Sequence, residues 1–198
     1  MPRDAGMTGA NDARFVGMVA LLGICGSLRK SSLNRALLDA VRDALPASAR
    51  MSMVDDLNLP IFNSDLDDPP SVVRLKAVIA ESDGVVFGVP EYNYSIPGGL
   101  KNALDWISRP PERSPMRGKP IGIVGAATGM SGTIRAQAHL RQMLLFSDSP
   151  CLSQPEVLIP RAHERFDTQG QLTDASTRTL LVKFGAAMVA FVERYRAR

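Results

Sequence analysis

The stretch Gly26-Ser27-Leu28-Arg29-Lys30-Ser31-Ser32-Leu33-Asn34 decides the fold of this chain. The apolar run before it, residues 16–25, is typical of a strand buried on both faces. After it, leucine and valine recur at helical spacing until Pro46, at positions 33, 37, 38, 41 and 45. The nonapeptide is therefore predicted to be the turn that leaves the carboxyl end of a first strand and opens the first helix.

The predicted turn carries groups that suit a phosphate dianion. Three serine hydroxyls and the free N–H groups of a helix start are donors, and Arg29 adds a charged, bidentate one. The turn lacks the glycine spacing of the dinucleotide fingerprint and of the P-loop, which favours a terminal monophosphate, as in a mononucleotide. An ordinary serine or asparagine helix cap is the alternative. The full set of serines with an arginine favours the phosphate.

Length and composition indicate one soluble globular domain. The chain has 198 residues, of which 45% are hydrophobic and 22% charged, and its formal net charge is +3. Because no block of like charges is present, a nucleic-acid surface is not expected. Residues 1–14 are expected to be a disordered extension ahead of a single domain over 15–198. The apolar run that follows is too short to span a membrane.

The cysteines and histidines show neither a disulfide nor a metal-binding pattern. Cys25 and Cys151 lie far apart and outside any C-x-x-C motif, so a reducing, cytoplasmic setting is expected. His139 and His163 have no metal-ligand spacing, and solvent or packing roles are expected for both. No metal site is predicted.

Strand-like and helical segments alternate along the chain, which favours an α/β fold. Strands are predicted at 16–25, 51–54, 85–89, 120–125 and 156–159. Helices are predicted at 33–45, at 71–83 with a cap at Ser71, at 99–108, at 133–146, and from a cap at Asp174 or Ser176 to Tyr195. Residues 58–70 read as a long loop. Near-continuous apolar strands predict a five-stranded parallel sheet, in the order 2-1-3-4-5, with helices on both faces.

Three loops of this predicted sheet should meet at one crevice. In the order 2-1-3-4-5 the switch point lies between strands one and three, where ligands bind beyond the carboxyl ends. The loops at 26–34, 90–98 and 126–132 all lead there. The second, Pro90-Glu91-Tyr92-Asn93, offers backbone groups to the edge of a planar ring, although good turn residues alone would also explain it. The small residues of the third loop would let it approach a ligand closely, or would simply make a strand-to-helix turn.

A phosphate cradle and a ring-binding edge at one crevice would suit FMN, and two motifs carry a family resemblance. Gly-Ser-Leu-Arg-x-x-Ser-x-Asn at 26–34 and Pro-Glu-Tyr-Asn-x-Ser-x-Pro-Gly-x-Leu-Lys-Asn-Ala-x-Asp-Trp at 90–106 resemble the NADPH-dependent FMN reductase family, in its chromate and quinone reductase branch. The resemblance runs from about residue 16 to near the C-terminus and includes Gln-Ala-His-Leu-Arg-Gln at 137–142. It implies a flavodoxin-like three-layer sandwich.

The resemblance also implies which residues bind FMN noncovalently. They are Ser27, Arg29, Ser32, Leu33 and Asn34 in the first loop, Pro90, Glu91, Tyr92, Asn93 and Ser95 in the second, and Ala127, Thr128 and Gly129 in the third. Ser131-Gly132 departs from the two glycines that close relatives often show there.

The implied activity is a ping-pong reduction. NADPH or NADH would pass a hydride to FMN, which would then reduce a small-molecule acceptor such as a quinone, chromate, an azo compound or free flavin. No catalytic side chain is implied. The family's members are typically homodimers or homotetramers. Two alternatives stay open: an electron carrier of the same fold without NAD(P)H reductase activity, and a flavin-free protein that uses this fold otherwise.

Overall fold

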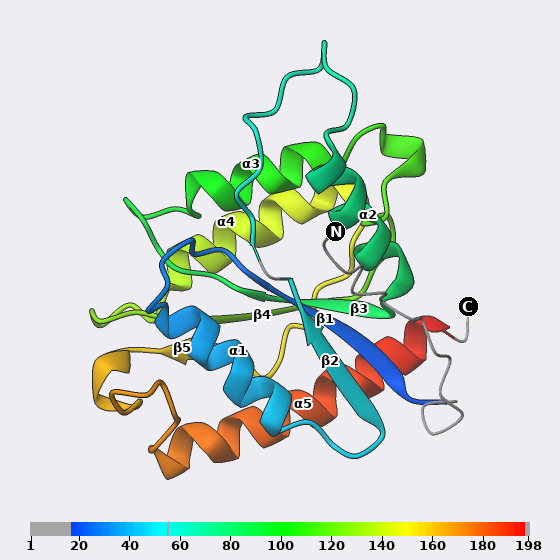
Figure 1. The fold of residues 1–198 in the computed structure, drawn as a ribbon. Helices are drawn as coiled ribbons and strands as arrows, with labels where there is room; N and C mark the ends of the chain where they lie inside the picture. Colours follow the sequence, from blue (N-terminus) through cyan, green and yellow to red (C-terminus); the bar gives the residue numbers. More distant parts are fainter. Residues whose placement is uncertain (1–16, 55, 197–198) are drawn as a thin grey trace, which may run out of the picture.

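Over residues 17–54 and 56–196, which the computed structural model describes, five strands form one parallel sheet in the order β2-β1-β3-β4-β5 (Figure 1). The predicted fold class and strand order are confirmed. The strands are β1 Val19–Cys25, β2 Ala49–Met53, β3 Gly84–Gly88, β4 Ile121–Ala126 and β5 Val157–Ile159. The expected extension at 1–14 lies outside the described residues.

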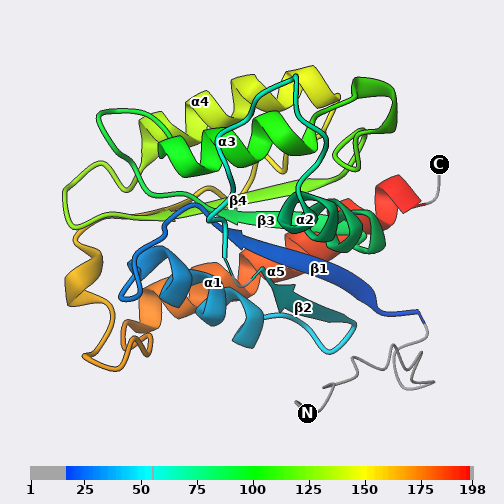
Figure 2. The same ribbon diagram turned by 45° about the horizontal axis from the view of Figure 1, so that its top comes forward.

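Helices cover both faces of the sheet and make a three-layer sandwich. Figure 2 shows α1 and α5 on one side, and α3 and α4 on the other. The helices are α1 Leu33–Asp43, α2 Pro70–Glu81, α3 Gly98–Ile107, α4 Ile134–Leu144 and α5 Ala175–Arg196; short 3₁₀ turns are η2 Pro111–Arg113, η3 Leu145–Ser147 and η4 Ala162–Glu164.

Each central strand contributes side chains to two hydrophobic cores, one on either face of the sheet. In β1, Leu21 packs into the core beneath α1 and α5, whereas its neighbours Leu22 and Ile24 pack into the core beneath α2, α3 and α4. Successive side chains of a strand point to opposite faces, so a strand buried on both faces has no polar side. This explains the unbroken apolar run in the sequence.

Some predicted element ends were wrong, for local physical reasons. Ser71 lies inside the first turn of α2, because Pro69 takes the cap position and Pro70 has the fixed φ that suits the first helical residue. Of the two caps proposed for α5, Asp174 is the one observed, since its Oδ1 accepts the N–H of Thr177 at 2.7 Å. The α4 helix ends at Leu144, ahead of the predicted residue 146, and tightens into η3.

The predicted long loop between β2 and α2 is pinned to α3. Asn102 accepts the N–H of Phe62 at 2.7 Å and donates to the carbonyl of Pro60 at 2.9 Å. The indole N–H of Trp106 also donates to Pro60, at 2.8 Å, and Phe62 packs edge-on against the Trp106 ring. Figure 1 shows this segment extending past α3.

The closing helix α5 is long and apolar, and it packs on the sheet. Among the described residues it is the one helix that could cross a membrane by length and composition. Its apolar stripe is nevertheless used in the core, where Leu181, Phe184, Met188 and Val192 are buried. At its end, Arg196 pairs with Asp83 and donates to the carbonyl of Met18 at 3.0 Å, which ties the helix to the start of the sheet.

Candidate functional site

Three loops meet at the carboxyl edge of β1, β3 and β4. The N–H of Gly26 donates to the carbonyl of Gly88 at 2.8 Å, and a side chain at Gly26 would meet Leu100 and Pro90 at 3.0 and 3.2 Å. The first loop therefore lies directly against the second. The third loop is fixed on its other side, because Ala127 donates to the carbonyl of Ile159 at 3.0 Å. The predicted meeting of the three loops is thus seen in the structure.

The first loop presents a cation and hydroxyls beside the start of α1. Ser32 is the N-cap of α1, and its Oγ accepts the N–H of Arg35 at 3.3 Å. Ser27 Oγ accepts the N–H of Arg29 at 3.3 Å, which shapes the loop. The Arg29 side chain is exposed and makes no hydrogen bond or ion pair with the residues that the structure describes. It is therefore available to an anion.

Asn34 and Leu33 hold the first loop to the sheet. Asn34 is 4% exposed, and its side-chain amide both donates to the carbonyl of Ala126 and accepts the N–H of Ala126, each at 2.9 Å. Leu33 is partly buried against the core beneath α1 and α5. The structure thus gives both residues an anchoring role, and their contact with FMN stays a prediction.

The second loop is a tight two-residue turn. Tyr92 and Ser95 exchange both backbone hydrogen bonds, at 2.9 and 3.0 Å. Asn93 and Tyr94, between them, have positive φ angles of 50° and 65°, the conformation of a type I′ turn. A rigid turn is what the sequence predicts here. Tyr92 is 45% exposed beside it.

Two predicted site residues of the second loop direct their side chains to α4. The Glu91 carboxylate pairs with Arg135, and Ser95 Oγ lies 3.0 Å from His139 Nδ1. Burial of the Glu91 carboxyl would raise its pKa, but the Arg135 guanidinium and the N–H groups of residues 135 and 136 outweigh this effect and hold the pKa below its ordinary value. Glu91 is therefore a stable anion.

The third loop is open at its tip and closely packed at its end. Ala127 is partly buried, whereas Thr128 and Gly129 are exposed. Gly132 has a φ of +55°, and a Cβ there would lie 2.9 Å from the backbone of Leu158. The loop therefore needs glycine at 132, but not at its neighbour Ser131.

Comparison with known proteins assigns the family. Residues 19–164 match the family model described as NADPH-dependent FMN reductase. The chain belongs to the NADPH-dependent FMN reductase family. It is 44% identical over 181 residues to an NAD(P)H-dependent FMN reductase of Pseudomonas aeruginosa, covering 90% of this chain and 97% of that one.

Other relatives in this family are named for quinones. A 2-hydroxy-1,4-benzoquinone reductase of a Burkholderia species is 40% identical, over 87% of this chain and 96% of its own. Among solved structures, the flavoenzyme NAD(P)H:(acceptor) oxidoreductase FerB of Paracoccus denitrificans superimposes with a TM-score of 0.82 at 36% identity, covering 90% of this chain and 99% of that chain. The flavodoxin-like fold of the family is thus confirmed.

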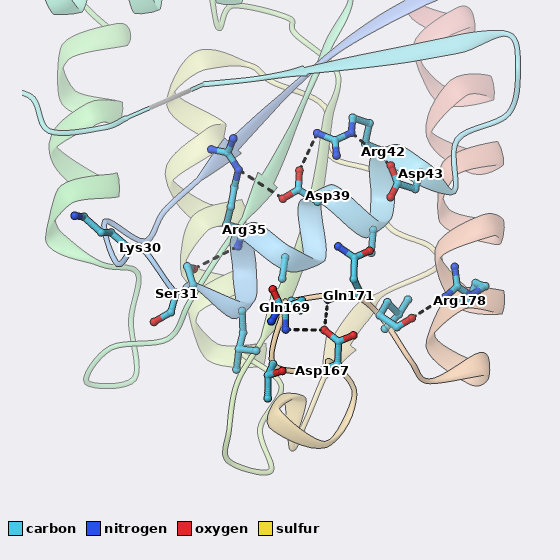
Figure 3. Close-up of a pocket in the computed structure, with 17 residues that line it drawn as sticks. Lys30, Ser31, Arg35, Asp39, Arg42, Asp43, Asp167, Gln169, Gln171 and Arg178 are labelled. Carbon is cyan, nitrogen blue, oxygen red and sulfur yellow. Dashed lines mark hydrogen bonds and ion pairs between the residues drawn. The ribbon is translucent and has the colours of Figure 1, made fainter.

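Two hollows adjoin the first loop of this family member. One, of about 460 Å³, is lined by Ser27 and Arg29 of the loop, by Cys25 at the end of β1, by Arg35 of α1 and by residues after β2. The other, of about 530 Å³, lies between α1 and residues 167–172 (Figure 3). On its α1 side, Asp39 pairs with both Arg35 and Arg42, and Asp43 pairs with Arg42, so two carboxylates balance two guanidiniums. The first hollow is the one that contains Arg29, whose side chain has no partner among residues 17–54 and 56–196.

Sequence reasoning missed the contribution of α4 to this site. Arg135 and His139 are four residues apart, so they lie on one helical face, and both contact the second loop. His139, expected in a solvent or packing role, is exposed and also bonds to Ser95. The i, i+4 spacing of Arg135 and His139 indicates that both lie on one face of a helix, but it does not reveal which loop that face contacts.

Proposed function

We propose that this chain is an NAD(P)H-dependent oxidoreductase that binds FMN noncovalently and reduces a quinone. The observation that carries the proposal is the meeting of three loops at one sheet edge, where Arg29, which has no partner among the described residues, lies beside the N-terminus of α1. The relatives' names point the same way, since they combine FMN, NAD(P)H and quinones.

The residues of the first loop fit the phosphate of FMN. The first N–H groups of an α-helix have no partner within the helix, and they favour an anion. The hydroxyl of Ser32 accepts a backbone N–H and lies 3.7 Å from Cys25 Sγ. When the Cys25 thiol donates in that contact, the Ser32 proton is left to donate to a phosphate. Arg29 and Ser27 add a charge and a second hydroxyl. We assign Ser27, Arg29 and Ser32 to the phosphate.

The second and third loops would hold the ring system. When bound, FMN supplies the hydride acceptance and donation that side chains cannot perform. The turn at 92–95 offers backbone groups in a rigid frame, and we assign Pro90, Tyr92 and Asn93 to the ring edge. Residues 127–129 would border the ring from the neighbouring strand. Rigid loops reduce the conformational entropy that is lost when FMN binds. In this proposal the residues of the chain orient FMN, and none of them acts as an acid or a base.

The further acceptors, the cellular location and the oligomeric state that we propose are those that the sequence leads us to expect. Chromate, azo compounds and free flavin are further acceptors to test beside quinones. We also propose a cytoplasmic protein, which is consistent with two free cysteines. A homodimer or homotetramer is proposed because large apolar side chains around the loops are exposed: Leu28, Tyr92, Tyr94, Met130 and Ile134.

The test begins with a visible spectrum of the purified protein. We expect a flavin spectrum that bleaches under anaerobic NADPH or NADH and returns when a quinone is added. Flavin that bleaches only with a chemical reductant would indicate an electron carrier instead. A protein that stays colourless with added FMN would refute the proposal.

Arg29→Ala provides the residue-level test. We expect it to raise the FMN Kd by about tenfold or more, because a charge-assisted bond to phosphate is lost. Arg117→Ala, at another exposed arginine outside the three loops, is the matched control and should leave the Kd unchanged. An unchanged Kd for Arg29→Ala would remove Arg29 from the phosphate site.

A further inference from the structure

Helix α4 begins without a cap of its own. Thr133 occupies the N-cap position with a φ of 71°, and its side chain makes no hydrogen bond to the helix start. Thr133 is fully buried, and its Oγ1 accepts instead from Gln137 Nε2 at 3.2 Å. The first turn also lacks an acidic residue. A partner from elsewhere in the chain is needed for the first N–H groups.

Glu91, on the second loop, is that partner. Its Oε2 accepts the N–H of Arg135 at 3.1 Å and the N–H of Ala136 at 3.3 Å. These are the second and third residues of α4, whose N–H groups an N-cap side chain normally serves. Its Oε1 accepts from Arg135 Nε at 2.7 Å, and the carboxylate side chain is 7% exposed. The Glu91 carboxylate is thus engaged mainly with α4, and it also accepts a hydrogen bond from Ser131 Oγ of the third loop at 3.5 Å.

Two further contacts join the same turn to the same helix face. The Arg135 guanidinium lies over the ring of Tyr94, 4.0 Å from its centroid. One helical turn later, His139 bonds to Ser95 at 3.0 Å. The turn at 92–95 therefore cannot shift without breaking contacts to α4, which itself follows directly on the third loop.

We propose that Glu91 is a positioning residue for FMN. It caps α4 from the neighbouring loop and so holds the turn at 92–95 and the loop at 127–133 in one relative arrangement. This inference rests on the proposed function, in which both loops border the flavin ring. Glu91 acts through α4, and its side chain makes no contact with the cofactor.

The experiment combines hydrogen exchange with FMN titration. Full-length wild type, Glu91→Gln and Glu91→Ala are measured without FMN and again after FMN is added, with Glu81→Gln on α2 as the control. We expect the amides of Arg135 and Ala136 to exchange about tenfold faster in Glu91→Ala, with a smaller effect in Glu91→Gln, which keeps an uncharged acceptor. The FMN Kd should rise as well, by about tenfold in Glu91→Ala and by less in Glu91→Gln.

A double-mutant cycle distinguishes positioning from direct contact. If Glu91 acts through α4, Arg135→Ala added to Glu91→Ala should raise the FMN Kd little further. Additive effects, or a raised Kd with unchanged amide exchange, would make Glu91 a direct ligand and overturn the inference. Faster exchange with an unchanged Kd would reduce Glu91 to a helix cap and would also overturn it. A wild type that binds no FMN would defeat the proposed function as well, while the exchange data would still report on the cap.

Discussion

Asn34 offers the sharpest test of how the site is held together. Its amide makes two hydrogen bonds of 2.9 Å to the peptide groups of Ala126, a residue that is 3% exposed. Asn34→Ala removes both bonds and leaves a buried N–H and a buried carbonyl without these partners. Each such group costs about 1 to 3 kcal/mol, so for the two groups we expect a loss of about 2 to 6 kcal/mol in the free energy of unfolding.

The assay is urea unfolding of the FMN-free protein, followed by circular dichroism. Asn34→Asp should be at least as damaging, because it keeps the acceptor for the Ala126 N–H but sets a carboxylate against the Ala126 carbonyl. Asn58→Ala, at an exposed asparagine, is the control and should stay within about 0.5 kcal/mol of wild type. If Asn34→Ala unfolds like wild type yet binds FMN weakly, Asn34 is a phosphate ligand and not an anchor.

Two further predictions concern the same sheet edge. Gly125→Ala would place a Cβ 1.7 Å from Thr133 Oγ1 and 2.9 Å from the carbonyl of Val89, so we expect a loss of about 2 to 3 kcal/mol or more in urea unfolding. Gly98→Ala is the control, because nothing lies within 4 Å of a Cβ at that position, and it should cause no loss of stability. Equal losses of stability in Gly125→Ala and Gly98→Ala would refute this reasoning. Because the pKa of Glu91 is held below the ordinary glutamate value of 4.5, the stability that its charge contributes is complete above that ordinary value and is lost as the pH falls through the folded-state pKa. The stability difference between wild type and Glu91→Gln should therefore shrink below about pH 4.5, and a difference that stays constant down to pH 3 would contradict the prediction.

Local features of the sequence predict most of the fold, because they depend on neighbouring residues alone. The apolar run before Gly26 predicts a strand buried on both faces, and the leucine and valine spacing after it predicts α1. The residues of 92–95 predict a rigid turn, which the positive φ angles of Asn93 and Tyr94 confirm. Element ends were less predictable, as at Ser71, because several residues in a row can serve as a helix start.

Only the tertiary structure shows which side chains join the loops to one another. Asn34 bonds to a residue 92 positions away, and Glu91 bonds to one 44 positions away. In the sequence each of these side chains is a polar residue in a motif, equally suited to a ligand and to a backbone partner. Parallel strands bring distant loop ends to one edge, and there a buried amide or carboxylate bonds to whichever unpaired backbone groups lie within reach. The sequence by itself therefore determined the sheet and the loops that meet at its edge, whereas packing decided which of their side chains anchor the site and which, like Arg29, stay free for a ligand.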